Sequence, residues 1–127
     1  MKRFVLDSSA VLAMLWAEPG AGVVNDCAEN AMISSVNLSE IVAKIHDRGF
    51  GEDKANFVVS DLKPKIIPFD RDQAIAAGHL RASTRQKGLS LGDRACLALA
   101  LQEKATVLTA DKAWSELDLG LEIKVIR

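Results

Sequence analysis

The feature that most constrains the fold is a series of five short apolar runs separated by segments with helical patterning. These runs lie at residues 3–6, 31–34, 65–69, 106–109 and 123–126. Several are apolar throughout, which is typical of strands covered on both faces. We therefore predict five short strands in one buried sheet.

The intervening segments predict helices, because their apolar residues recur with helical spacing or they carry helix-capping signals. The predicted helices span residues 9–16, 22–30, 38–48, 54–62, 72–87 and 91–102. Alternating strands and helices favour parallel pairing through right-handed crossovers. With 127 residues, we expect one α/β domain over residues 1–127, built as a three-layer α/β/α sandwich.

Four carboxylates are expected at one end of this sheet. Asp7 directly follows the first run and Asp111 lies just past the fourth. Glu40 lies in the first turns of the helix after the second run, and Asp93 begins the helix before the fourth. Ligands of parallel sheets gather outside the carboxyl ends of the strands. We therefore expect these four acids to converge in one crevice.

Each acid also has a purely structural interpretation. Asp7 and Asp111 suit the N-caps of the helices that follow them. Glu40 could complete a capping box with Asn37, and Asp93 could complement the dipole of its helix. These roles explain the acids singly, but they do not explain four acids at the same end of one sheet.

Clustered carboxylates imply a cation. Two like charges 4 Å apart repel by roughly 4 kcal/mol at an effective dielectric constant near 20, so such a group takes up protons or binds a metal. Oxygen ligands without Cys or His select Mg²⁺ or Mn²⁺. We interpret His46 and His79 as surface or packing residues. A metal–carboxylate site of this kind suits phosphoryl chemistry.

Composition limits the binding partners and the cellular compartment that we expect for the protein. The net charge is −1, so binding of a polyanion through bulk positive charge is excluded. Cys27 and Cys96 lack metal-like or redox-like spacing and are expected to be buried thiols in a reducing cytoplasm. The apolar run at the start is too short for a signal peptide, and no stretch is long enough to span a membrane.

Four stretches together resemble a known family. They are FVLDSSAVLAML, SSVNLSEIV, LSLGDRACLALA and VLTADKAW, in this order. The chain resembles PIN-domain ribonucleases over essentially its whole length, and most closely the VapC-type toxins of VapBC toxin–antitoxin pairs. The resemblance implies strand order 3-2-1-4-5. It also implies that Asp7, Glu40, Asp93 and Asp111 are catalytic and ligate Mg²⁺ or Mn²⁺.

Further residues follow from the same resemblance. Ser8 and Thr109 match supporting hydroxyl positions, with strand-end or N-cap roles as the structural alternative. Arg94 and Lys112 are candidate substrate-binding residues, although a solvated Arg94 is slightly favoured. Some relatives carry a further acid one helical turn after the position of Asp93. Cys96 and Leu97 stand there in this chain, which puts a second tightly held metal in doubt.

The implied activity is metal-dependent endonucleolytic cleavage of structured RNA, a transfer RNA or a ribosomal RNA, which inhibits translation. A VapB-type antitoxin and a second copy of the chain are the implied protein partners. Trp16 is a candidate antitoxin contact or a packed core edge, and Trp114 is expected in the core. Lys44 and other basic residues could contact RNA or be solvated.

Three alternatives remain open at this point. The first is a catalytically inactive PIN-fold binding module. A haloacid-dehalogenase-like phosphatase needs a second Asp where Ser9 stands. A receiver domain needs paired acids after the first strand and a phosphoacceptor after the third, where Asp70 more closely resembles a helix cap.

Overall fold

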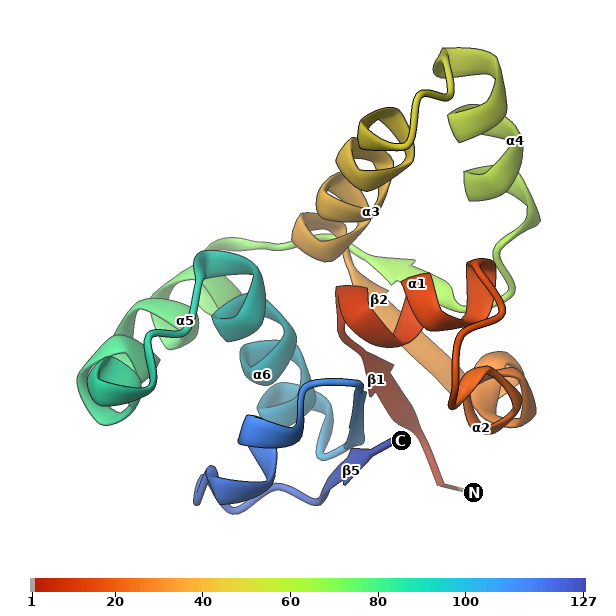
Figure 1. Ribbon diagram of the computed structural model, residues 1–127. Coiled ribbons are helices and arrows are strands. Elements are labelled where there is room, and N and C mark those ends of the chain that lie inside the picture. The colour runs from red at the N-terminus through yellow and green to blue at the C-terminus, as the bar shows by residue number, and fades with distance from the viewer. Residues whose placement is uncertain (1) are drawn as a thin grey trace.

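A five-stranded parallel sheet forms the centre of the protein in the computed structural model, which describes residues 2–127 (Figure 1). The strand order is β3-β2-β1-β4-β5, and each neighbouring pair is parallel. The predicted fold class and strand order are thus confirmed. The strands are β1 (Phe4–Leu6), β2 (Ala31–Ser34), β3 (Lys65–Ile67), β4 (Thr106–Thr109) and β5 (Ile123–Val125).

Helices cover both faces of this sheet, as Figure 1 shows. They are α1 (Ser8–Leu15), α2 (Ala21–Cys27), α3 (Ser35–Asp47), α4 (Glu52–Asp61), α5 (Arg71–Thr84) and α6 (Leu91–Glu103), with 3₁₀ turns η1 (Ala28–Asn30), η2 (Arg85–Lys87) and η3 (Lys112–Glu116). Along β1, Leu6 packs with α1 to α4, while Val5 packs with α5 and α6. This alternation of neighbouring strand residues produces the three predicted layers.

Several element boundaries differ from the prediction by one to three residues, and two of these differences have a clear local cause. Helix α3 begins at Ser35, because the hydroxyl of Ser34 caps it by accepting a bond from Val36 N at 3.3 Å. The Asn37–Glu40 capping box therefore does not form, since both residues lie inside the helix. Strand β3 ends at Ile67, because Pro68 has no N–H to continue the ladder.

The helix α6 is buried along most of its length, as its Ala- and Leu-rich sequence predicts. Cys96 in this helix is buried, whereas Cys27 is only partly buried, and both thiols are free. Trp114 lies in the core, as expected. Within residues 2–127, no helix has both the length and the apolar character required to cross a bilayer.

Candidate active site

Asp7 is a buried carboxylate at the junction of β1 and α1. It is 5% exposed, and its Oδ1 accepts bonds from Ala10 N at 2.9 Å and Ser9 Oγ at 2.7 Å. Its Oδ2 accepts a 2.7 Å bond from the hydroxyl of Thr109 at the end of β4. Asp7 is therefore an N-cap, as the structural interpretation holds, and it also faces the crevice beside β4.

Burial raises the pKa of Asp7 to about 6. The bonds from Ser9, Thr109 and Ala10 act in the opposite direction, and the negative charge of Asp93 adds a smaller upward contribution. Among the described residues, no cationic group contributes to this balance. A carboxylate that is buried without a compensating positive charge is a favourable place for a metal ion.

Glu40 approaches from α3, on the opposite side of this crevice. Its Oε1 accepts bonds from Ser8 Oγ at 2.5 Å and from Asn37 Nδ2 at 2.9 Å. Its carboxylate rests against Gly92, where a Cβ atom would overlap it. Position 92 therefore requires the absence of a side chain for Glu40 to occupy this place.

Asp93 and Asp111 both take part in local caps at the mouth of the crevice. The Oδ2 of Asp93 accepts a 2.9 Å bond from Ser90 N, and Ser90 Oγ accepts from Asp93 N at 3.2 Å, which forms a capping box. The Oδ1 of Asp111 accepts from Ala113 N at 3.0 Å and caps η3. These bonds fit the structural interpretations, and they leave each carboxylate with a second oxygen outside its cap.

All four acids line a single hollow of about 510 Å³. The charges of Asp7, Asp93 and Glu40 also raise the pKa of the buried Cys96 thiol, although desolvation is the larger cause. The complete lining is Asp7, Ser8, Ser9, Leu12, Glu40, Ala43, Lys44, Asp47, Asp93 and Asp111. The convergence expected from the positions of the acids in the sequence is thus present.

The donor set of this hollow is composed of oxygen atoms, which suits a hard divalent ion. Within residues 2–127, however, no three Asp, Glu, His or Cys side chains are already close enough to hold a metal ion. The hydrogen bonds of Asp7 and the cap of Asp93 keep these carboxylates with protein partners instead. The chemistry of the residues fits Mg²⁺ or Mn²⁺, and binding would require the carboxylates to move closer together.

The family model for the PIN domain matches residues 4–119 of this chain. The chain belongs to the PIN domain family. The match includes all four acids, and the sheet order of this PIN domain is the one that the sequence resemblance implied. Among curated proteins, no sequence matches this chain significantly.

Solved structures of similar fold include toxin–antitoxin proteins. One is DNA-bound VapBC from Salmonella typhimurium, with a TM-score of 0.76, 21% identity and coverage of 98% of both chains. Another is VapBC2 from Rickettsia felis bound to a promoter DNA fragment, with a TM-score of 0.72, 20% identity and coverage of 95% and 96%. A third is Mycobacterium tuberculosis VapC20, a Sarcin-Ricin loop cleaving toxin, with a TM-score of 0.71, 15% identity and coverage of 88% and 92%.

The other residues singled out in the sequence have different positions in this PIN domain. Ser8 and Thr109 contact two of the acids directly, as described above. Arg94 is directed toward α5, where its Nη1 donates a 3.0 Å bond to Ala77 O. Lys112 is exposed and lies outside the hollow. The structure thus brings neither candidate substrate-binding residue to the lining of the cleft.

Sequence reasoning missed the role of Ser9. Its hydroxyl donates to Asp7 and accepts a 2.9 Å bond from Ala110 N, so it connects α1 to the segment after β4. The signal that could have revealed it is its position two residues after a buried N-cap acid, where a hydroxyl can reach back to the carboxylate. Lys44 is the one cationic residue in the described lining of the hollow.

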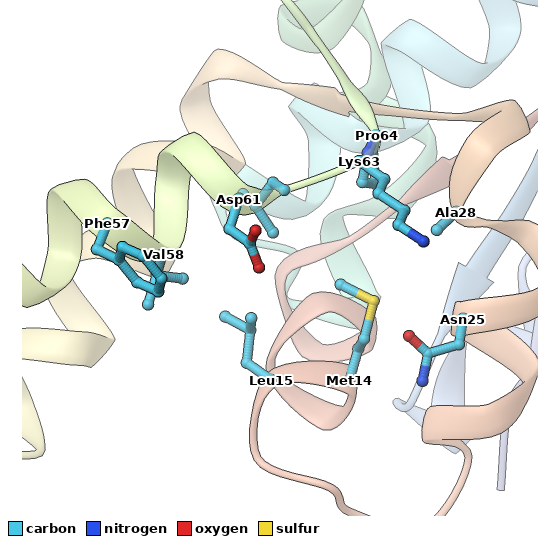
Figure 2. Close-up of a pocket in the computed structure, with 10 residues that line it drawn as sticks. Met14, Leu15, Asn25, Ala28, Phe57, Val58, Asp61, Lys63 and Pro64 are labelled. Carbon is cyan, nitrogen blue, oxygen red and sulfur yellow. The ribbon is translucent and has the colours of Figure 1, made fainter.

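A second hollow, of about 210 Å³, lies between α1, α2 and α4. Figure 2 shows Leu15 of α1 on the side of Phe57 and Val58 from α4, and Met14 of α1 on the side of Asn25 and Lys63. Phe57 is 63% exposed, which is unusual for a large apolar side chain. We call this hollow the apolar groove; its other lining residues are Asn25, Ala28, Asp61, Leu62 and Pro64.

Proposed function

We propose that this PIN domain is a metal-dependent endoribonuclease and the toxin of a type II toxin–antitoxin pair. The observation that carries the proposal is the convergence of Asp7, Glu40, Asp93 and Asp111 in one hollow, where Asp7 is buried and has no cationic partner among residues 2–127. Membership of the PIN family and the similarity in fold to VapBC proteins support the same assignment.

Asp7, Asp93 and Asp111 would hold Mg²⁺ or Mn²⁺, and Glu40 would hold the metal or orient the attacking water. When bound, a divalent ion supplies Lewis acidity, a water of lowered pKa and neutralisation of the charge that develops on the phosphate. The expected products are a 5′-phosphate and a 3′-hydroxyl. No nucleophilic Ser or Cys is required for this reaction.

The protein itself contributes orientation. Three donors hold the carboxylate of Asp7, and two donors hold that of Glu40, so each side chain has a defined orientation before a metal ion draws the carboxylates closer together. A defined orientation of each side chain lowers the conformational entropy that is lost when the site assembles around the metal. We infer that Ser9 and Thr109 orient Asp7, while Ser8 orients Glu40.

The substrate we propose is structured RNA, either a transfer RNA loop or a ribosomal RNA loop, whose cleavage inhibits translation in the cytoplasm. The similarity to a toxin described as cleaving the Sarcin-Ricin loop supports a ribonuclease rather than another phosphoesterase. Lys44 is exposed at the wall of the hollow, where it could contact a backbone phosphate.

The partner we propose is a VapB-type antitoxin that seats an apolar segment in the apolar groove. Similar folds occur in solved VapBC complexes, which supports a partner of this type. The groove presents exposed apolar surface, with Asp61 and Lys63 to pair with charges on a bound segment. Trp16, the candidate antitoxin contact, is half-buried, and Cζ of Arg48 lies 3.5 Å from the centre of the Trp16 ring. Homodimer formation stays a prediction from the resemblance.

Cleavage of RNA by the purified protein tests this function. We expect endonucleolytic products with Mg²⁺ or Mn²⁺, none with excess EDTA, and none from Asp7→Asn, whose side chain is nearly isosteric. Asp26→Asn, at an exposed position of α2, serves as the matched control and should cleave like the wild type. Metal binding without any RNA cleavage would favour the inactive binding module, and cleavage that persists in EDTA and in Asp7→Asn would exclude the proposed chemistry.

A further inference from the structure

The side chain of Asn37 joins α1, α3 and α6, and it contacts Ser8 and Glu40, which line the hollow. It is 1% exposed, and its Nδ2 lies 2.9 Å from Glu40 Oε1, 3.0 Å from Gly92 O and 3.3 Å from Ser8 Oγ. A carboxylate and a main-chain carbonyl can only accept hydrogen bonds. This environment therefore orients the amide with its nitrogen toward Glu40 and Gly92.

The other end of this amide is not satisfied. Among the described residues, the buried Oδ1 of Asn37 has no hydrogen-bond partner. Burial of an unpaired carbonyl oxygen costs free energy. Asn37 should therefore stabilise the fold less than an apolar residue of similar size would. The presence of Asn37 is better explained by the groups that its nitrogen holds.

Asn37 holds Glu40 in a defined place. Its bond and the bond from Ser8 both reach Oε1, so neither of them occupies Oε2. The same amide nitrogen also binds Gly92 O, and Gly92 lacks the Cβ that would overlap the Glu40 carboxylate. Asn37 thereby fixes Glu40 against the first turn of α6, one residue before Asp93.

We propose that Asn37 is a positioning residue for the metal site, acting through Glu40 and Gly92. This inference rests on the proposed function, because it assumes that Glu40 faces a bound divalent ion. Partners that orient a metal ligand contribute strongly to affinity, and their loss lowers it by about 10–100-fold. Tight metal binding should therefore require both the bond from Asn37 to Glu40 and the space beside Gly92 that the Glu40 carboxylate occupies.

The test is the Mn²⁺ affinity of metal-free protein, measured by the electron paramagnetic resonance signal of the free ion. Asn37→Leu removes the donor at nearly constant volume and should weaken Mn²⁺ binding about 10–100-fold. Gln73→Leu is the matched control, because Gln73 is also 1% exposed and has a buried Oε1 without a partner, but lies on α5 outside the hollow. Its Mn²⁺ affinity should equal that of the wild type.

A second variant decides the question if Asn37→Leu does not fold. Gly92→Ala leaves every donor in place and suits a helix, but its Cβ displaces the carboxylate of Glu40. It should weaken Mn²⁺ binding by a similar factor. In a Glu40→Ala background, neither Asn37→Leu nor Gly92→Ala should weaken binding further, and equal effects with and without Glu40 would overturn the inference.

These measurements separate the inference from the function on which it rests. If the wild type binds Mn²⁺ in a manner that depends on Glu40 and Asn37 but cleaves no RNA, the proposed function fails and the positioning role stands. If the wild type cleaves RNA and Asn37→Leu binds Mn²⁺ as tightly as the wild type, the positioning role fails and the function stands.

Discussion

The hydroxyl of Thr109 donates a 2.7 Å hydrogen bond to Oδ2 of Asp7, although the two residues are 102 positions apart in the sequence. The same oxygen of Thr109 accepts a 3.0 Å bond from Asp111 N. Thr109 therefore connects two of the four acids and joins the carboxyl ends of β1 and β4. Its side chain is fully buried, so water does not replace these bonds.

Thr109→Val should destabilise the protein and shift its pH dependence. The variant leaves the buried Oδ2 of Asp7 and the N–H of Asp111 short of a partner, which should lower the free energy of unfolding by about 1–3 kcal/mol. Loss of the donor also removes an interaction that lowers the pKa of Asp7, so the acid limb of the cleavage profile should move to higher pH.

Thr106→Val is the control for this experiment, measured by chemical denaturation and by the pH profile of cleavage. Thr106 begins the same strand, and its hydroxyl donates at 2.7 Å to Glu122, which is exposed. Loss of the Thr106 hydroxyl should lower the free energy of unfolding less than Thr109→Val does, and it should leave the pH profile of cleavage unchanged. An equal shift in both variants would contradict a specific role for Thr109.

Metal-free protein should lose stability as the pH rises from about 4 to 6. The pKa of Asp7 is about 6 in the folded state against an ordinary value of 3.8, so the folded state keeps a proton that the unfolded chain has released. At pH 7 the buried charge of Asp7 lowers the free energy of unfolding by about 3 kcal/mol, which is about 1.36 kcal/mol for each unit between the two pKa values.

Asp7→Asn should therefore be more stable than the wild type at pH 7 in EDTA, by up to about 3 kcal/mol. The difference should disappear below about pH 3, where Asp7 is protonated in both states. Added Mn²⁺ should raise the melting temperature of the wild type much more than that of Asp7→Asn. Thermal unfolding across this pH range, with and without metal, measures both effects, and a variant less stable at pH 7 would contradict the burial penalty.

Lys44→Gln should weaken RNA binding without changing the bond that is cut. Lys44 is the one cation in the described lining of the acidic hollow, and an exposed ion pair is worth up to ~1 kcal/mol, or about a fivefold rise in KM. The slope of the logarithm of the RNA affinity against the logarithm of the salt concentration should also decrease by about 1, because one fewer counterion is released. Lys124→Gln, on β5 and outside the hollow, is the control, and equal losses in both would indicate only a general effect of charge.

Phe57→Asp should weaken the binding of an antitoxin to the apolar groove at least about tenfold, because burying a full Phe side chain contributes about 1.5–3 kcal/mol. The partner to use is the cognate VapB-type antitoxin proposed above, with binding measured by calorimetry. Phe50→Asp is the matched control, since Phe50 is 47% exposed and does not line the groove. Equal affinities of the two variants would place the antitoxin elsewhere.

Much of the fold could be predicted because it follows from local patterns. The apolar runs of β1 and β4 are short and continuous, and a buried parallel sheet is the structure that satisfies such runs. Boundaries were less certain where neighbouring residues compete for the same cap. At the start of α3, the hydroxyl of Ser34 caps the helix by accepting a bond from Val36 N, so the helix starts three residues earlier than predicted.

The identities of the candidate site residues were predictable, but their interactions were not. Asp7 follows a strand and Asp93 begins a helix, and both positions are visible in the sequence. Nothing local indicates that Arg94 turns toward Ala77 on α5, or that Asn37 reaches Gly92. These contacts depend on how α3, α5 and α6 pack, because their partners are distant along the chain.

The sequence by itself determined the class of the fold and the end of the sheet at which the acids gather, because strand polarity and helix start signals are local properties. The tertiary structure alone decided how these acids are held. A hydrogen bond requires its partners to come within about 3 Å, and for pairs such as Asp7 and Thr109 only the packing of the sheet and its helices produces that approach.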